Sequence, residues 1–222
     1  MKFFQARAMV LAALAISMAG VSQGAIYLES GDTGQLPGTT QAATGTGSLL
    51  EIQGTLIDGL DADMFRIWIT DPASFFAMTV ESPFFVSDPQ LFLFDSSGAG
   101  VYMNDDGDGL GSQSALPQSH PFGPILPGVY YLAIGWFDNE PLTAAGRVFV
   151  DGTGTTGPNP MTASLPVIGW NDDFSGRIDL PVDYSILIGG VTAIPEPSTL
   201  LLLCAGLGLV ALRKYYNHRS EE

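Results

Sequence analysis

Side chains that carry oxygen gather in one short stretch, Asn104-Asp105-Asp106-Gly107-Asp108-Gly109. Asn104, Asp106 and Asp108 alternate along it and a glycine follows, as in the first half of an EF-hand calcium loop. The bidentate glutamate of such a loop would fall at Ala115, which excludes a true EF-hand. We expect a looser calcium site here, completed by carboxylates from other parts of the chain: Asp61, Asp63 or Asp95. The alternative is a solvated acidic turn, since Asn, Asp and Gly all favour turns.

The charge balance also favours a divalent cation. Between Ala25 and Ile194 the chain has three Arg and no Lys against 20 Asp and Glu, a net charge of −17. Such a surface repels phosphate backbones and anionic lipid, so nucleic acid is not an expected partner. Calcium is the one cofactor that the sequence predicts.

Residues for covalent or acid–base catalysis are scarce in the same span. His120 is its only histidine, and it contains no Gly-x-Ser-x-Gly nucleophile motif. The single cysteine, Cys204, lies in a C-terminal apolar run, so disulfides and thiol chemistry are excluded from the folded part. We therefore predict that the protein is not an enzyme. A secreted hydrolase with paired carboxylates is the least favoured alternative.

Three tryptophans offer another kind of contact, stacking on sugar rings. Alternation along 130–136 places Trp136 with apolar residues on a core-facing side. Trp68 is the candidate for an exposed stacking residue, and a carbohydrate-binding module is accordingly the main alternative function.

Short runs of strand length must position these residues. They are rich in β-branched and aromatic side chains and are separated by Asp, Gly, Pro or Ser: 49–57, 64–69, 75–80, 90–94, 101–103, 129–136, 147–150, 165–170 and 184–191. We predict an all-β fold, an antiparallel β-sandwich or jelly roll, over residues 49–192. In the second run Phe65, Ile67 and Ile69 should face the core, with Arg66 and Trp68 on the other side. Residues 25–48, rich in Gly and Thr, are expected to form a flexible arm.

The two ends of the chain have the composition of targeting segments. Residues 1–24 combine Lys2 and Arg7 with an apolar run and small residues, which predicts a signal peptide for the Sec export machinery. Residues 198–212 are apolar and predict a short transmembrane helix. The basic residues beyond that helix would keep the tail in the cytoplasm.

The order Pro195-Glu196-Pro197-Ser198-Thr199, then a Leu/Gly/Ala segment, then Arg213-Lys214, resembles the PEP-CTERM sorting signal of Gram-negative bacteria over residues 194–219. The resemblance implies that an exosortase recognises Pro195, Glu196 and Pro197 and removes the anchor. The product would then reach the cell surface or the extracellular matrix, where anionic exopolysaccharide is the expected partner.

A second resemblance rests on four motifs in order between residues 56 and 137. They are Asp61-Ala62-Asp63-Met64-Phe65, Leu91-Phe92-Leu93-Phe94-Asp95-Ser96-Ser97-Gly98, Asn104-Asp105-Asp106 and Gly128-Val129-Tyr130-Tyr131. This pattern is similar to that of bacterial pre-peptidase C-terminal (PPC-like) domains. The resemblance implies a small β-sandwich without enzymatic activity, of the kind attached to secreted proteases or carried by surface proteins.

Overall fold

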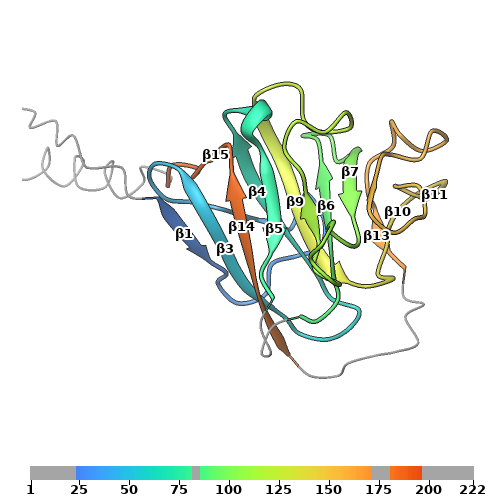
Figure 1. Cartoon of the computed structure of the whole chain (residues 1–222), viewed down its shortest axis with the longest axis horizontal. Helices are drawn as coiled ribbons and strands as arrows, with labels where there is room; N and C mark the ends of the chain where they lie inside the picture. The colour runs from blue at the N-terminus through green and yellow to red at the C-terminus, as the bar shows by residue number, and fades with distance from the viewer. Residues whose placement is uncertain (1–23, 82–85, 172–180, 197–222) are drawn as a thin grey trace, which may run out of the picture.

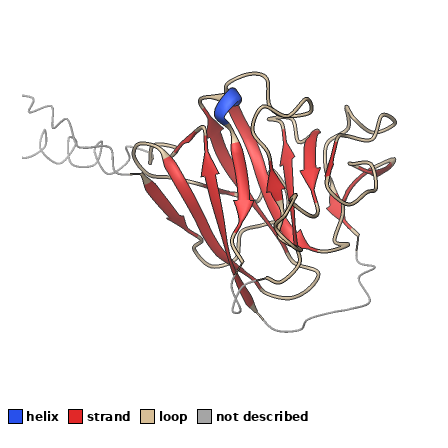
Figure 2. Ribbon diagram, in the orientation of Figure 1, coloured by secondary structure: helices blue, strands red, loops and turns tan. Residues whose placement is uncertain are grey.

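The computed structural model describes residues 24–81, 86–171 and 181–196 (Figure 1). This part of the chain is built almost entirely from strands, as Figure 2 shows, and its helical content is one 3-10 turn, η1 (Pro72–Ser74). No helix in the described ranges is long and apolar enough to span a bilayer. The predicted membrane segment 198–212 lies outside the described residues, as do residues 1–23 of the predicted signal peptide.

Two sheets face each other. The first has the order β1-β3-β14-β5-β8. Its strands are β1 (Ala25–Leu28), β3 (Leu49–Leu56), β14 (Val182–Gly189), β5 (Phe76–Thr79) and β8 (Ala115–Leu116). The second has the order β12-β7-β6-β9-β4-β15, with β2 also paired to β4. Its strands are β12 (Thr155–Thr156), β7 (Gly100–Asn104), β6 (Pro89–Phe94), β9 (Gly128–Trp136), β4 (Ala62–Ile69), β15 (Val191–Thr192) and β2 (Gln41–Ala42).

The core between the sheets follows the alternation of the strands. Phe65, Ile67 and Ile69 of β4 are fully buried in it, whereas Arg66 and Trp68 are exposed, as predicted. Neighbouring strands add the inward-facing residues Ile52, Leu91, Leu93, Tyr130, Leu132, Ile134, Trp136, Tyr184, Ile186 and Ile188. The predicted β-sandwich is confirmed at the level of two apposed, mainly antiparallel sheets.

A third layer, which the sequence did not predict, covers the outer face of the second sheet. It contains β10 (Pro141–Thr143), β11 (Gly146–Arg147) and β13 (Gly169–Trp170), seen in Figure 1 on the side of the second sheet away from β3 and β14. Phe92 of β6 packs edge-on against Trp170, with ring centroids 5.2 Å apart. Every residue of β6 is therefore buried, on both faces of the strand.

Residues 25–48, expected to form a flexible arm, belong to the sandwich in the structure. β1 pairs in parallel with β3, and β2 pairs in parallel with β4. Ala43 is fully buried, and the Thr33 hydroxyl donates to the carbonyl of Met64 at 2.9 Å. Backbone pairing holds this segment, and such pairing does not require large apolar side chains.

Candidate functional site

The predicted calcium loop begins where β7 ends. The Asn104 amide is engaged within the fold: Nδ2 donates to the Asp106 carbonyl at 3.0 Å and to Thr155 Oγ1 at 3.1 Å. Its Oδ1 accepts from the Ala115 N–H at 2.6 Å. Asp108 is exposed on the following turn. Asn104 therefore shapes the loop through hydrogen bonds of its own.

Two of the carboxylates expected to complete the loop lie elsewhere. The ladder β4-β9-β6-β7 places Asp63 and Asn104 in one row, three strands apart, a separation of about 14 Å. Asp95 closes the hairpin at the other end of β6, where its Oδ1 accepts from the Ser97 N–H at 2.8 Å. The residues predicted from the sequence are not gathered into one site.

A different acidic group forms beside the loop. Asp88 immediately precedes β6, while Asp105 and Asp106 immediately follow β7, and antiparallel pairing brings these two strand ends together. One carboxylate oxygen of each residue lies within 4.8 Å of the other two. We call Asp88, Asp105 and Asp106 the aspartate triad. Asp106 was predicted as a ligand, whereas Asp88 and Asp105 were not.

The triad is a poor environment for three negative charges. Burial, followed by the charges of Asp106 and Asp88, raises the pKa of Asp105 to about 6, although a hydrogen bond from Gln90 opposes the shift. Burial and the charge of Asp106 likewise raise the pKa of Asp88. The Oδ1 atoms of Asp105 and Asp106 are buried and have no hydrogen-bond partner among the described residues.

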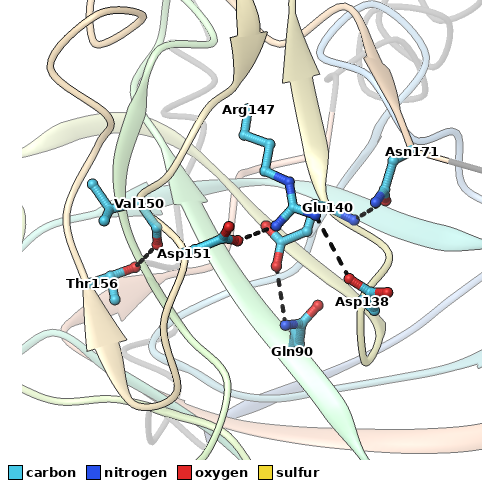
Figure 3. Close-up of polar contacts among 8 residues, drawn as sticks. All are labelled: Gln90, Asp138, Glu140, Arg147, Val150, Asp151, Thr156 and Asn171. Carbon is cyan, nitrogen blue, oxygen red and sulfur yellow. Dashed lines mark hydrogen bonds and ion pairs between the residues drawn. The ribbon is translucent and has the colours of Figure 1, made fainter. Parts of the chain in front are cut away.

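Figure 3 shows the polar contacts that join Gln90 of β6 to residues of the third layer. Gln90 Nε2 donates to Glu140 Oε1 at 3.2 Å, and burial raises the pKa of Glu140 to about 6 despite the nearby charge of Arg147. Arg147 itself pairs with Asp138, 3.8 Å away, and with Asp151. Its charge is therefore engaged by carboxylates outside the triad.

Beside the triad runs a groove of about 520 Å³. Asp106 borders both features, so a ligand in the groove would lie close to whatever occupies the triad. Asp108 adds a second carboxylate, and the rest of the wall mixes polar and apolar residues, among them Met78, Leu110, His120 and Thr155.

A second group of acids, the buried acidic cluster, consists of Glu29, Asp32 and Asp63. Asp63 is fully buried, and its Oδ2 accepts from the Tyr184 hydroxyl at 2.7 Å. Burial, reinforced by the charge of Asp61, raises the pKa of Asp63 to about 9. Asp63 is accordingly a neutral carboxylic acid at pH 7.

Glu29 of this cluster and the neighbouring Asp61 are held by hydrogen bonds from backbone N–H groups. The two carboxylate oxygens of Glu29 accept from the N–H groups of Thr33 at 2.7 Å and Thr55 at 2.9 Å. Asp61 Oδ2 accepts from the Ile57 N–H at 2.7 Å and closes the β3–β4 turn. Burial also raises the pKa of Asp61, to about 6. Glu29 and Asp61 therefore act as loop caps.

The tryptophans do not form a shared platform. Trp136 is 3% exposed and Trp170 is 8% exposed, with the Trp170 indole donating to the Gln35 carbonyl. Trp68 is 46% exposed on the outer face of β4. Arg66 is exposed two positions before it, and strand alternation places both side chains on that face.

The sorting segment begins directly at the edge of the sandwich. The Ile194 N–H donates to the Ala43 carbonyl at 2.9 Å, and the Ile194 carbonyl accepts from the Gly45 N–H at 3.0 Å. Pro195 and Glu196 follow and are exposed, while Pro197 lies outside the described residues. The described part of the segment is therefore accessible immediately beyond its last backbone contacts.

Comparison with known families supplies one match. Residues 193–214 match the model of the PEP-CTERM protein-sorting motif, which includes Pro195, Glu196 and Pro197. No curated protein matches the chain. The resemblance of residues 56–137 to PPC-like domains stays a prediction, because the matched family covers the C-terminal motif alone. The chain carries the motif of exported proteins that an exosortase sorts.

Proposed function

We propose that this protein is a non-enzymatic component of the cell surface or extracellular matrix, released from a C-terminal membrane anchor by an exosortase. The observation that carries the proposal is the PEP-CTERM motif at 193–214. The exposure of Pro195 and Glu196 supports it, because a processing enzyme needs access to the segment it recognises.

The surroundings of His120 support a non-catalytic role. Its ring lies nearly parallel to that of Tyr102, with centroids 5.9 Å apart, and its Nδ1 accepts from the Phe122 N–H at 3.3 Å. A general base needs its imidazole within hydrogen-bond reach of a nucleophile. Here the ring packs against an aromatic side chain instead.

In our proposal the matrix partner is an anionic exopolysaccharide, and calcium mediates the contact. A domain with a net charge of −17 repels an anionic polymer. A divalent cation bound at the aspartate triad would neutralise local charge, stiffen the loops and offer coordination positions to sugar oxygens. The groove beside Asp106 gives such a polymer a surface to occupy.

The first experiment is the intact mass of the protein recovered separately from membrane and extracellular fractions of its host. Loss of the residues beyond the Pro195–Pro197 region, with the product outside the inner membrane, is the expected result. A single full-length mass confined to the membrane would contradict exosortase release and indicate a tethered ectodomain.

A second candidate function, sugar binding through Trp68, is favoured by one observation. The exposed indole shares a face with Arg66, one of the few cations in the exported part, and this pair suits an acidic sugar. Trp68→Ala should weaken retention on the host's polysaccharide about tenfold, the loss expected for one aromatic contact. Phe137→Ala, at a residue that is 42% exposed, is the matched control and should retain binding. Equal retention of both variants would exclude the stacking contact.

A further inference from the structure

We propose that the aspartate triad, Asp88, Asp105 and Asp106, is a calcium site that clamps the loop after β7 to the start of β6. The inference rests on the calcium part of the proposed function, for which it names the ligands. It is independent of the sorting motif.

The spacing of the carboxylates fits a shared cation. Ca²⁺ binds carboxylate oxygens at about 2.4 Å, so ligands on opposite sides of one ion are separated by about twice that distance. The three triad oxygens lie within 4.8 Å of one another. A calcium ion among them would contact all three after only small side-chain adjustments.

The unsatisfied atoms at the site also indicate a ligand. Asp105 is 4% exposed and its Oδ1 has no hydrogen-bond partner among the described residues; the same holds for Oδ1 of Asp106. Buried polar atoms are normally paired, and a carboxylate without a partner is especially costly. A divalent cation would satisfy these oxygens together.

The cation closest to Glu140 in Figure 3, Arg147, is committed to other carboxylates. It pairs with Asp138 and Asp151. No ion pair joins a triad residue to a Lys or Arg within the part of the chain that the structure describes. Among the described residues the triad charges thus have no ion-pair partner, a role that a bound ion would fill.

The loops that bear the ligands are already fixed. Ser112 Oγ donates to the Ser87 carbonyl at 2.9 Å, and Gln113 Nε2 donates to the Val86 carbonyl at 3.2 Å. The Gly107 N–H donates to the Gln113 carbonyl at 2.7 Å. A Cβ on Gly107 would stand 3.1 Å from the Gln113 carbonyl oxygen, so the turn after Asp106 leaves little room for a side chain. The triad is thus preorganised, which lowers the entropic cost of binding.

The chemistry of the ligands selects the ion. The triad offers oxygen atoms only, the preference of Ca²⁺ and Mg²⁺, whereas zinc sites usually include His or Cys. Ca²⁺ tolerates irregular geometry and accepts more ligands, while Mg²⁺ requires a near-ideal octahedron. Calcium therefore suits a site assembled from two loops.

The buried acidic cluster has the same spacing, and its Asp63 Oδ1 is also buried without a hydrogen-bond partner among the described residues, but more of its oxygens are satisfied. Both oxygens of Glu29 accept backbone N–H groups, and Asp63 accepts from Tyr184 through one oxygen. The elevated pKa of Asp63 also lets that residue keep a proton, which satisfies part of the cluster without a metal. Of the two acidic groups, the triad has the greater need for a cation.

The test uses the full chain in detergent micelles, stripped with chelator and titrated with CaCl₂. We expect a Kd of about 10⁻⁴ to 10⁻³ M by calorimetry, the range of extracellular calcium modules. At a calcium concentration about a hundredfold above Kd, the melting temperature should rise by about 5–10 °C. Magnesium at the same concentration should produce a smaller rise.

The decisive variants are Asp105→Asn and Asp106→Asn, with Asp108→Asn as the control on the same loop but outside the triad. Each triad variant should lose at least about tenfold in calcium affinity, whereas Asp108→Asn should respond like the wild type. In chelator, Asp105→Asn should melt no lower than the wild type, because it removes a buried charge. A purely structural Asp105 would instead melt lower.

The possible outcomes distinguish a wrong assignment of the ligands from an absence of calcium binding. If calcium stabilises the wild type and both triad variants equally, the assigned ligands are wrong and calcium acts elsewhere. If calcium neither binds to the wild type nor raises its melting temperature, the site and the calcium part of the proposed function are both wrong. In neither case is exosortase release affected.

Discussion

Asp63 is a carboxyl group in a place where a negative charge is costly. It is fully buried, close to Glu29 and Asp61, and receives one hydrogen bond from Tyr184. Its pKa of about 9 means that the folded protein keeps a proton which the unfolded chain releases near pH 4. The stability contributed by this proton is complete below pH 4 and is lost as pH rises toward 9.

This linkage predicts that, in chelator, the domain becomes less stable between pH 7 and 9. The slope should approach about 1.4 kcal/mol per pH unit, or roughly 3 °C in melting temperature. Asp61, Asp105 and Glu140, whose pKa values rise only to about 6, contribute below this window. Thermal unfolding at half-unit pH steps measures the slope.

Asp63→Asn should abolish the slope, because an amide carries no titrating proton yet still accepts from Tyr184. Asp183→Asn, on an exposed residue of β14, should retain it. A wild-type melting temperature that is constant from pH 7 to 9 would show that Asp63 is ionised in the folded protein.

The turn between β14 and β15 shows how an element depends on one glycine. Gly190 has φ +71°, and its carbonyl accepts from the N–H groups of Thr70 and Asp71. A Cβ at this position would lie 2.5 Å from the Asp71 carbonyl oxygen. The turn therefore needs glycine both for its dihedral angle and for space.

Gly190→Ala should destabilise the domain by roughly 3 kcal/mol, adding steric overlap to the strain of a positive φ. Gly31→Ala is a matched control, since Gly31 has φ +70° but nothing within 4 Å of its Cβ position. That variant should lose only about 1 kcal/mol. Similar melting temperatures for the two variants would mean that the β14–β15 turn relaxes to admit the methyl group.

Strand β4 illustrates what the sequence predicts about an element and where prediction stops. Alternation identified Phe65, Ile67 and Ile69 as core residues because it is a local property of the strand. It did not indicate that Met64 is also buried, on the opposite face. The third-layer strands that cover this face come much later in the chain, and no local pattern reports their position.

The candidate site follows the same rule. Spacing within 104–109 pointed to alternate residues of this loop, whereas the triad consists of the adjacent Asp105 and Asp106 together with Asp88. Asp88 joins through the pairing of β6 with β7, which is a tertiary fact. The Asp-Pro that opens β6 was visible in the sequence, but nothing in its spacing linked it to Asp105.

At the scale of the whole molecule, the composition of the sequence predicted an all-β fold, but it did not predict which segments pair within the two sheets. The Gly/Thr-rich residues 25–48 lack the apolar side chains that announce a buried segment, yet β1 and β2 complete both sheets. These two strands contribute backbone hydrogen bonds, which the amino-acid composition does not reveal. The terminal motif was predictable in full, because a sorting motif is defined by the order of its residues along the chain.

The two ends of the described chain meet at one pole of the sandwich. Ala25 and Ala193 both lie against Gly45, where an added Cβ would stand 3.3 and 3.2 Å from their Cβ atoms. Along β4, roughly 17 Å of strand separates Trp68, which pairs with β15, from Asp63 at the acidic end. If the proposed anchor holds the protein at the membrane, this pole would lie near the lipid headgroups, and the end of the sandwich that carries the aspartate triad would face away from them. Removal of the anchor would then release the domain without changing the end that carries the aspartate triad.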